Sequence, residues 1–210
     1  MIITEIKKIG KGNRYSLYID EEFVGAFEAE ILAKNKLKTG QELSHDELQR
    51  LKIENGDYAS FDRALSVLEK SMKTEKGVRD FLIQKGYPEE CVERSIEKLK
   101  EYGYINDEFF TESYIKTYSF SKGKKKIKYE LISKGVDKQI IDEKLADLIE
   151  EDEEIESCKR LAKKYLKNKT IDEKTRNKLS NHLVSKGFGY DVVSKVVREV
   201  IKETEDESWD

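Results

Sequence analysis

The pentapeptide LISKG, residues 131–135, recurs in this chain as LVSKG at 183–187 and as LIQKG at 82–86. The final glycines of the three copies lie 49 and 52 residues apart. When the copies are aligned on these glycines, six other positions are apolar in all three: eight and four residues before the glycine, and one, six, ten and thirteen residues after it. The repeat therefore extends beyond the pentapeptide, and its period of about 50 residues is typical of a structural unit.

The spacing of these apolar positions predicts two helices separated by the glycine. Residues four apart share one helical face, as do the positions six, ten and thirteen after the glycine. Glycine suits the left-handed residue that ends a helix, because it has no Cβ to clash. The leucine before it and the apolar residue after it then make the contact of a Schellman ending. We expect Asp137 to cap the next helix of its unit, and Pro88 to lie in the first turn of its counterpart.

A third helix is predicted before each pair. In the first repeat, apolar residues from Tyr58 to Met72 recur at steps of three and four. In the second, Asn106 is a candidate N-cap for a helix with an aromatic stripe. In the third, residues 155–166 show a weaker helical pattern. We therefore predict a mainly α fold of three tandem three-helix repeats. Units that contact mainly their neighbours stack into an elongated, curved array.

The first 56 residues show a different pattern, with short alternating runs and turn residues between them. The predicted strands are Ile2–Ile9, Arg14–Ile19 and Phe23–Phe27. A hairpin turn at GKGN, residues 10–13, joins the first two. A helix around Ile31 and Leu32 follows, and Ser44 with Glu47 predicts the capping box of another, short helix. The predicted organisation is a β-hairpin/helix module at 1–56, three-helix repeats at 57–103, 104–151 and 152–204, and an acidic tail at 205–210.

The composition narrows the class of protein. Charged residues make up 40% of the chain and apolar residues 37%, with a net charge of −3. No apolar run approaches the ~18 residues of a membrane helix, and the N-terminus lacks the apolar block of a signal peptide. We therefore expect a cytoplasmic, monomeric protein without membrane contact. Cys91 and Cys158 form no CxxC pattern, so reduced, partly buried thiols are expected.

The sequence predicts no catalytic residues. It contains neither the GxxxxGK[ST] phosphate loop nor HExxH. His45 and His182 are too scattered for a metal site and too few for much acid–base chemistry near neutral pH. We therefore expect a protein that is not an enzyme and needs no metal or cofactor.

The first candidate binding segment is SKGKKKIK, residues 121–128, which contains no acid. Its basic residues are Lys122, Lys124, Lys125, Lys126 and Lys128. It begins a predicted helix, where cations are unfavourable against the helix dipole. Two interpretations stay open: a solvated helix face, or a patch that meets phosphates or an acidic protein surface. Helical phase places the stem of Lys124 near the buried stripe and the other four lysines outward.

A second basic cluster follows an acidic run. Residues 150–156 contain six acids, whereas residues 159–202 contain 13 basic and 4 acidic residues. The candidates on the first helix of the third repeat are Lys159, Arg160, Lys163, Lys164 and Lys167. The aromatic residues Tyr102, Tyr104, Phe109, Phe110 and Tyr114 are expected in the core rather than as base-stacking platforms.

The junction EYGYINDEFF, residues 101–110, resembles the signature phrase of the RecX family, regulators of the RecA recombinase. Asn106 stands where an aspartate is common in that family. TEKGVRDFLIQKG at 74–86, the basic helix after SKG, and RYSLYIDEEFVGAF at 14–27 followed by LKTGQEL also fit. The resemblance covers essentially the whole chain, and the N-terminal sheet looks like the Gram-positive type.

The resemblance implies three tandem three-helix repeats that bind along the helical groove of the RecA–DNA filament. Such proteins inhibit strand exchange, ATP turnover and the coprotease activity on LexA-type repressors, bind DNA weakly, and are not enzymes. Two other hypotheses rest on the residues alone. One is a helical-repeat protein that binds nucleic acid directly through its basic helix faces, and the other is a passive scaffold.

Overall fold

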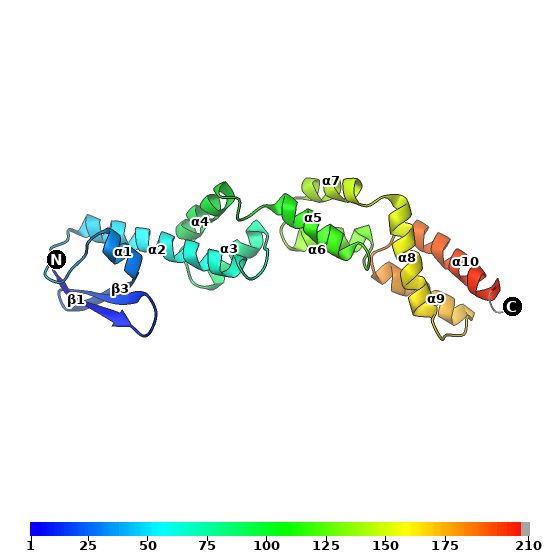
Figure 1. Ribbon diagram of the computed structural model, residues 1–210, viewed down its shortest axis with the longest axis horizontal. Helices are drawn as coiled ribbons and strands as arrows, with labels where there is room; N and C mark the ends of the chain where they lie inside the picture. Colours follow the sequence, from blue (N-terminus) through cyan, green and yellow to red (C-terminus); the bar gives the residue numbers. More distant parts are fainter. Residues whose placement is uncertain (207–210) are drawn as a thin grey trace. The chain divides into compact units, whose positions relative to one another are not determined.

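The computed structural model describes residues 1–206, which form three strands and ten helices (Figure 1). The strands are β1 (Ile3–Ile9), β2 (Arg14–Ile19) and β3 (Glu22–Glu28). The helices are α1 (Ala29–Lys34), α2 (His45–Leu68), α3 (Glu75–Gln84), α4 (Glu89–Glu101), α5 (Asp107–Tyr118), α6 (Lys124–Ser133), α7 (Lys138–Leu148), α8 (Glu151–Leu166), α9 (Glu173–Ser185) and α10 (Tyr190–Asp206). The mainly α fold with a small N-terminal sheet is confirmed.

The described chain divides into two compact units. The first contains residues 1–73 and 77–105, and the second contains residues 74–76 and the chain from Asn106 onward. The first unit holds the sheet, α1, α2, α4 and α3 from Gly77 onward, and the second holds the start of α3 and α5 to α10. Each three-helix group has its own apolar core, so the second unit contains two such cores.

The N-terminal sheet is antiparallel, with the strands in the order β1-β2-β3. Its inner face carries Ile3, Leu17 and Phe27, all at most 2% exposed. These side chains share one core with residues of α1 and α2, among them Ile31 and Leu51. The two helices therefore supply the cover that a three-stranded sheet needs.

Helix α2 differs from the prediction in its length. Its capping box is confirmed: the Ser44 hydroxyl accepts the Glu47 N–H, and the Glu47 carboxylate accepts the Ser44 N–H. The helix that begins there is not short, because it continues for 24 residues through the predicted module boundary after Gly56. Met72 lies beyond its end and is 52% exposed, so its placement on the apolar stripe was wrong.

The recurring glycines end helices as predicted. Gly86, Gly135 and Gly187 have φ angles of +84°, +85° and +93°. The Gly135 N–H donates to the Ile132 carbonyl at 2.9 Å, and the Val136 N–H donates to the Leu131 carbonyl at 3.2 Å. The same pair of hydrogen bonds recurs at the other two glycines, with distances of 2.9 to 3.4 Å. This is the Schellman pattern, and it appears in all three repeats.

A fourth copy of this ending closes α4. Gly103 has a φ of +72°, its N–H donates to the Lys100 carbonyl at 3.0 Å, and the Tyr104 N–H donates to the Leu99 carbonyl at 2.8 Å. The turn leads into Asn106, whose side chain accepts the Phe109 N–H at 2.9 Å as the N-cap of α5. The phrase EYGYINDEFF therefore contains a helix ending followed by a helix beginning.

The predictions for the starts of α7 and α4 and for the C-terminal tail have different outcomes. Asp137 caps α7 and accepts the Gln139 N–H at 2.7 Å, as expected. Pro88 is the N-cap of α4 and lies one residue before its first turn, which corrects the prediction. The predicted acidic tail, 205–210, begins inside α10, which continues to Asp206. Residues 207–210 lie outside the described residues.

Candidate functional site on the second and third repeats

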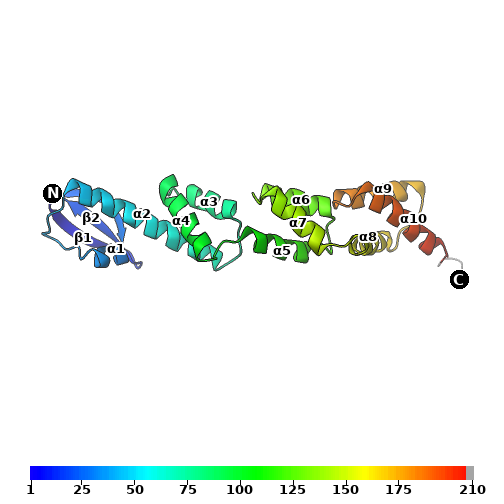
Figure 2. The same ribbon diagram turned by 90° about the horizontal axis from the view of Figure 1, so that it is seen from above.

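The basic segment of the second repeat begins α6 at a junction with the third repeat. The Gly123 N–H donates to the Lys186 carbonyl at 2.9 Å, and the Lys125 N–H donates to the Gly187 carbonyl at 3.2 Å. Lys186 and Gly187 close α9, so the free N–H groups of α6 meet the free carbonyls of α9 and the two helices run head to tail (Figure 2). This contact satisfies backbone groups that helix ends otherwise leave to water.

The head-to-tail contact also changes the electrostatic argument about the lysines. Cations beside the N-terminus of α6 oppose its dipole, but the same cations lie beside the C-terminus of α9, where they are favourable. The unfavourable charge placement that the sequence indicated is therefore largely compensated by a neighbouring helix, and a binding role needs evidence from the individual side chains.

Four of the five lysines have a partner within the described residues, and Lys122 and Lys126 are two of these four. The Lys122 ammonium lies 2.6 Å from a Glu130 oxygen and 3.9 Å from the centre of the Tyr118 ring. The expectation that Lys122 points outward was therefore wrong. The Lys126 ammonium lies 3.4 Å from the Ser185 carbonyl, across the junction of the two repeats.

The other three lysines line one hollow of about 310 Å³ between α6 and α7. Lys124 is half-buried, as expected, and its backbone N–H donates to Glu154 at 3.0 Å. Lys128 forms an ion pair with Asp142 on α7. Lys125 is exposed and forms no ion pair within the described residues.

Two exposed tyrosines flank Lys125. Tyr129 is 74% exposed and lies four residues along the same face of α6. Tyr190, at the start of α10, is 70% exposed, and its ring centre lies 5.7 Å from the Lys125 ammonium. We call Lys124, Lys125, Lys128, Tyr129 and Tyr190 the α6 face. Sequence reasoning missed both tyrosines, although the helical phase of Tyr129 relative to Lys125 was a usable signal.

The second basic cluster, on α8, is partly tied to α10. Lys159 lies 2.7 Å from Glu199, and Lys163 lies 2.8 Å from Glu203. Its hydrogen bond with Glu199 raises the pKa of Lys159, and the hydrogen bond with Lys163 lowers the pKa of the Glu203 carboxyl. These pairs join two helices of the third repeat, so we assign them a structural role.

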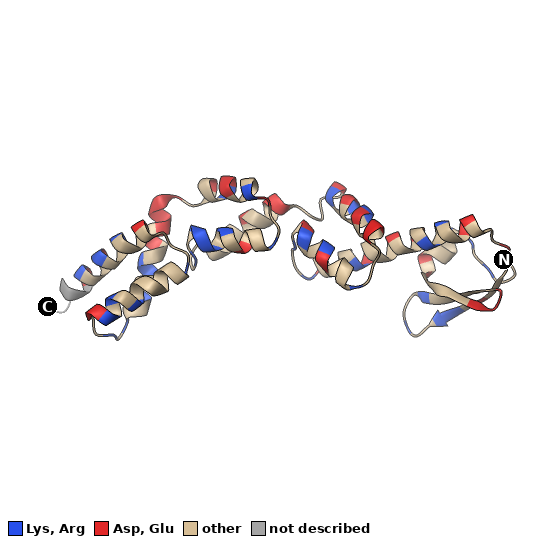
Figure 3. Ribbon diagram, turned by 180° about the vertical axis from the view of Figure 1, so that it is seen from behind, with Lys and Arg blue, Asp and Glu red and all other residues tan. Residues whose placement is uncertain are grey.

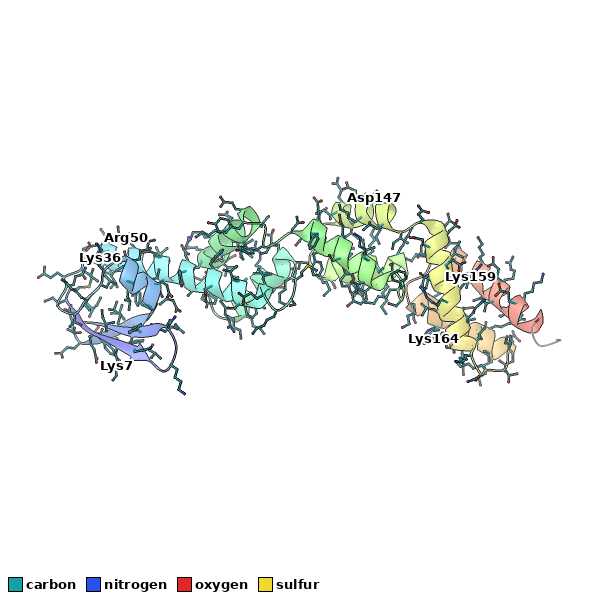
Figure 4. The ribbon with its side chains drawn as sticks, in the orientation of Figure 1. Lys7, Lys36, Arg50, Asp147, Lys159 and Lys164 are labelled. Atoms are coloured by element: carbon teal, nitrogen blue, oxygen red, sulfur yellow. The ribbon has the colours of Figure 1, made fainter. Side chains whose placement is uncertain are left out.

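The other members of this cluster point elsewhere. Arg160 donates to the Phe120 carbonyl at 3.2 Å and lies over the Phe120 ring, which joins the third repeat to the second. Lys164 and Lys167 are exposed and form no ion pair within residues 1–206. Figure 4 shows Lys159 and Lys164 on α8. Five residues apart, they lie on different faces of the helix.

The acidic run before this cluster fits the helix that it begins. The first turn of α8 is Glu151, Asp152, Glu153 and Glu154, and its last turn contains Lys163 and Lys164. Figure 3 shows this change from acidic to basic along α8. Acids at the N-terminus and cations at the C-terminus both complement the helix dipole. The charge separation along this segment therefore has a local structural cause.

The described residues give little indication of activated side chains. Burial, with Glu154 adding to it, raises the pKa of the Cys158 thiol to about 12, and burial also raises the pKa of Cys91. Such thiols are poor nucleophiles. Burial lowers the pKa of His182, whose ring packs 4.9 Å from Tyr165. Among residues 1–206, no cluster of His, Cys, Asp or Glu has the composition of a metal site.

Tandem three-helix repeats with an exposed basic and aromatic face define a helical-repeat protein with a candidate binding surface. Comparison with known families narrows this class. The model of the RecX first three-helix domain matches residues 61–99, the second matches 106–145 and the third matches 151–197. The N-terminal domain model of regulatory protein RecX matches residues 1–44. The chain belongs to the RecX family of regulatory proteins.

Similar proteins and structures agree with this assignment. A regulatory protein RecX of Clostridium perfringens is 40% identical over 189 residues, with 89% of each chain covered. One of Clostridium beijerinckii is 39% identical over 200 residues, covering 94% of this chain and 93% of the relative. A crystal structure of a regulatory protein RecX matches with a TM-score of 0.68 and 25% identity, covering 93% of this chain and 98% of the other. The structure of RecX from Lactobacillus salivarius has a TM-score of 0.62 and 30% identity, with 69% and 96% covered.

Within residues 1–206, every helix is too short or too polar to cross a membrane.

Proposed function

We propose that this protein is a non-enzymatic inhibitor of RecA that binds in the groove of the RecA–DNA filament. The relatives are named regulatory proteins, and RecX proteins regulate RecA. On this proposal the protein acts as a cytoplasmic monomer and restrains recombination, repair and the SOS coprotease activity of the filament.

The observation that supports this proposal best is the α6 face. It combines an exposed lysine without an ion pair in the described residues, two further lysines around a hollow that pair with Glu154 and Asp142, and two tyrosines at 74% and 70% exposure. Cations of this kind suit phosphates of filament-bound DNA or carboxylates on the filament protein. Exposed aromatic rings suit stacking with unpaired bases.

Tandem repeats suit a partner that is itself a repeating assembly. Linked binding modules engage neighbouring copies of a partner with higher avidity than one module alone. A chain that contacts more than one filament subunit restrains the movements that ATP turnover and strand exchange require. Inhibition is therefore expected at fewer than one molecule of this protein per RecA.

The direct test is the DNA-dependent ATPase rate of RecA, measured against increasing amounts of this protein, with strand exchange as a second readout. Inhibition of both below a one-to-one ratio supports the proposal. Unchanged ATP turnover and strand exchange in the presence of excess protein contradict it.

A second candidate function is direct binding of nucleic acid, which the position of Tyr129 and Tyr190 beside Lys125 favours. Binding to single-stranded DNA without RecA, measured over a salt series, separates the two functions. Tight, strongly salt-dependent binding without any effect on RecA would support the second function over the first.

A further inference from the structure

A concave feature of the first unit has no role assigned so far. It is a cleft of about 800 Å³ along α2, bounded by α1 and α4. Its apolar lining includes Ile53, Tyr58 and Phe61, which extend along successive turns of α2. All its lining residues belong to the same compact unit.

Apolar side chains in and beside this cleft are unusually exposed. Ile53 is 49% exposed and Tyr58 is 36% exposed. The patch continues past the cleft, because Tyr102 packs edge-on to Phe61 at 6.2 Å and Tyr104 packs edge-on to Tyr102 at 6.3 Å. Tyr102 and Tyr104 are 57% and 55% exposed, so their expected place in the core was wrong. A continuous apolar patch rimmed by polar groups is typical of a protein-binding surface.

Two of the three acids that line the cleft are paired among residues 1–206, and two of its cations are not. Glu54 is held by Lys34 at 2.5 Å, and Asp57 accepts two hydrogen bonds from Arg94 at 2.8 and 2.9 Å. Arg50, shown in Figure 4, has no ion pair within the described residues.

On the opposite wall the Lys98 ammonium lies 5.2 Å from the centre of the Phe61 ring, with no ion pair in the part of the chain that the structure describes. Glu30 is the one lining carboxylate without an ion pair there. The rim therefore presents more free positive than negative charge to a partner.

The cleft is preformed by close packing of α2 on α4. A Cβ on Gly56 would lie 2.8 Å from the Cys91 sulfur, so a larger residue there would force the Cys91 side chain or the helices to shift. Ser60 and Ser95 share a buried hydrogen bond of 2.7 Å between their hydroxyls. A rigid framework of this kind lowers the entropy that a partner loses on binding.

The chemistry of the walls selects the kind of occupant. The lining is helical apart from Asn35, so it offers no strand edge on which an extended peptide could add a strand. The polar groups are largely paired with one another, which leaves few convergent groups to orient a small ligand. Apolar side chains on successive turns suit a partner helix whose own ridges pack into the groove. From Arg50 to Phe61 the groove is about 16 Å long at 1.5 Å per residue, or about three turns.

We propose that this cleft docks an amphipathic helix of about three turns with acidic side chains beside its apolar face, presented by RecA. This rests on the proposed function for the identity of the partner. The first unit then makes a protein–protein contact, while the α6 face of the second unit contacts the nucleic acid. Arg50 and Lys98 pair with the acidic side chains, and Ile53 and Tyr58 become buried.

The test compares Ile53→Glu with Ile83→Glu in the full-length chain. Ile83 is a matched control because it also lies on a helix of the first unit and is 50% exposed, against 49% for Ile53, but it lies outside the cleft. Binding of the dye-labelled protein is titrated by fluorescence anisotropy, once with RecA filaments on oligo(dT) and once with bare oligo(dT). Arg50→Glu tests the charge, and circular dichroism confirms the helix content of all variants.

We expect Ile53→Glu to weaken filament binding by about tenfold or more, since it places a carboxylate in an apolar contact. Arg50→Glu weakens it less, Ile83→Glu leaves it unchanged, and binding to bare oligo(dT) stays at the wild-type level throughout. If the wild-type protein neither binds nor inhibits the filament, both the proposed function and the occupant of the cleft are wrong. If the wild type inhibits and Ile53→Glu equals Ile83→Glu, the cleft proposal alone is overturned. Unchanged binding by Arg50→Glu overturns the acidic character of the partner helix.

Discussion

The three repeated glycines have the same backbone conformation but different neighbours, so alanine at each should have a different cost. All have φ between +84° and +93°, where a Cβ is strained by about 1–2 kcal/mol. At Gly86 an added Cβ meets nothing within 4 Å, so Gly86→Ala should cost only this strain. At Gly135 the Cβ would lie 2.5 Å from the Lys76 Cβ, which is fixed to the backbone of α3, so Gly135→Ala should add this overlap to the strain.

Gly187→Ala should be the most destabilising of the three. Its Cβ would lie 2.5 Å from the backbone nitrogen of Lys126, which cannot move without moving α6. Relief of this overlap separates α9 from α6 and breaks the hydrogen bonds from Gly123 to Lys186 and from Lys125 to Gly187. Each is worth about 0.5–1.5 kcal/mol, so with the strain the total is about 2–5 kcal/mol.

The assay is urea unfolding followed by circular dichroism, with hydrogen exchange by mass spectrometry to locate the loss. We expect the unfolding midpoint to fall in the order Gly86→Ala, Gly135→Ala, Gly187→Ala, with the largest fall for the last. Exchange should increase at the start of α6 in Gly187→Ala, because its N–H groups lose their carbonyl partners. Equal losses of stability for Gly86→Ala and Gly187→Ala would refute the role of the glycine as a docking point for the neighbouring helix.

Three further predictions concern individual side chains. Changing Lys125 to glutamine should leave the helix content intact and lower the log–log salt slope of single-stranded DNA binding by ~0.7 for the one lost phosphate contact. Lys122→Gln is the comparison and should leave that slope unchanged, because its ammonium is held by Glu130 within the fold; a reduced slope would contradict this. With a pKa of about 12 against an ordinary 9.0, Cys158 holds its proton longer when folded. The free energy of unfolding should therefore fall as pH rises from about 9 toward 12. Alkylation of the Cys158 thiol at pH 8.5 should occur only as fast as the protein unfolds. Rapid labelling of Cys158 in the folded protein would contradict its burial.

Most features that depend on neighbours in sequence were predicted correctly, although Pro88 and Met72 were misplaced. The helix endings at the three repeated glycines follow from a left-handed glycine and apolar residues on one helical face, and both signals are local. The caps Ser44, Asn106 and Asp137 follow from hydrogen bonds between residues two or three apart. The β-strands were found because alternation has a period of two residues.

Long-range features were not predictable in the same way. Nothing local showed that α2 continues past Gly56, since a glycine within a helix usually weakens the helix. In the structure, close packing against the Cys91 sulfur favours glycine at this position. The aromatic residues Tyr102, Tyr104 and Phe109 were expected in the core by type, yet all three are more than half exposed. Their exposure depends on which helices cover them.

The candidate site shows the same division between local and long-range information. The sequence alone determined that basic residues gather at the start of α6 and along α8, because the charge of a side chain follows from its residue type. Which carboxylate pairs with which cation depends on how the helices pack, and the chain has 43 acids to choose from. Only the tertiary structure decided that Lys159 pairs with Glu199 and Lys122 with Glu130, while Lys125 stays exposed beside Tyr190. An ion pair forms only where two side chains lie close together in the folded protein. The periodicity of the sequence does not determine which side chains these are.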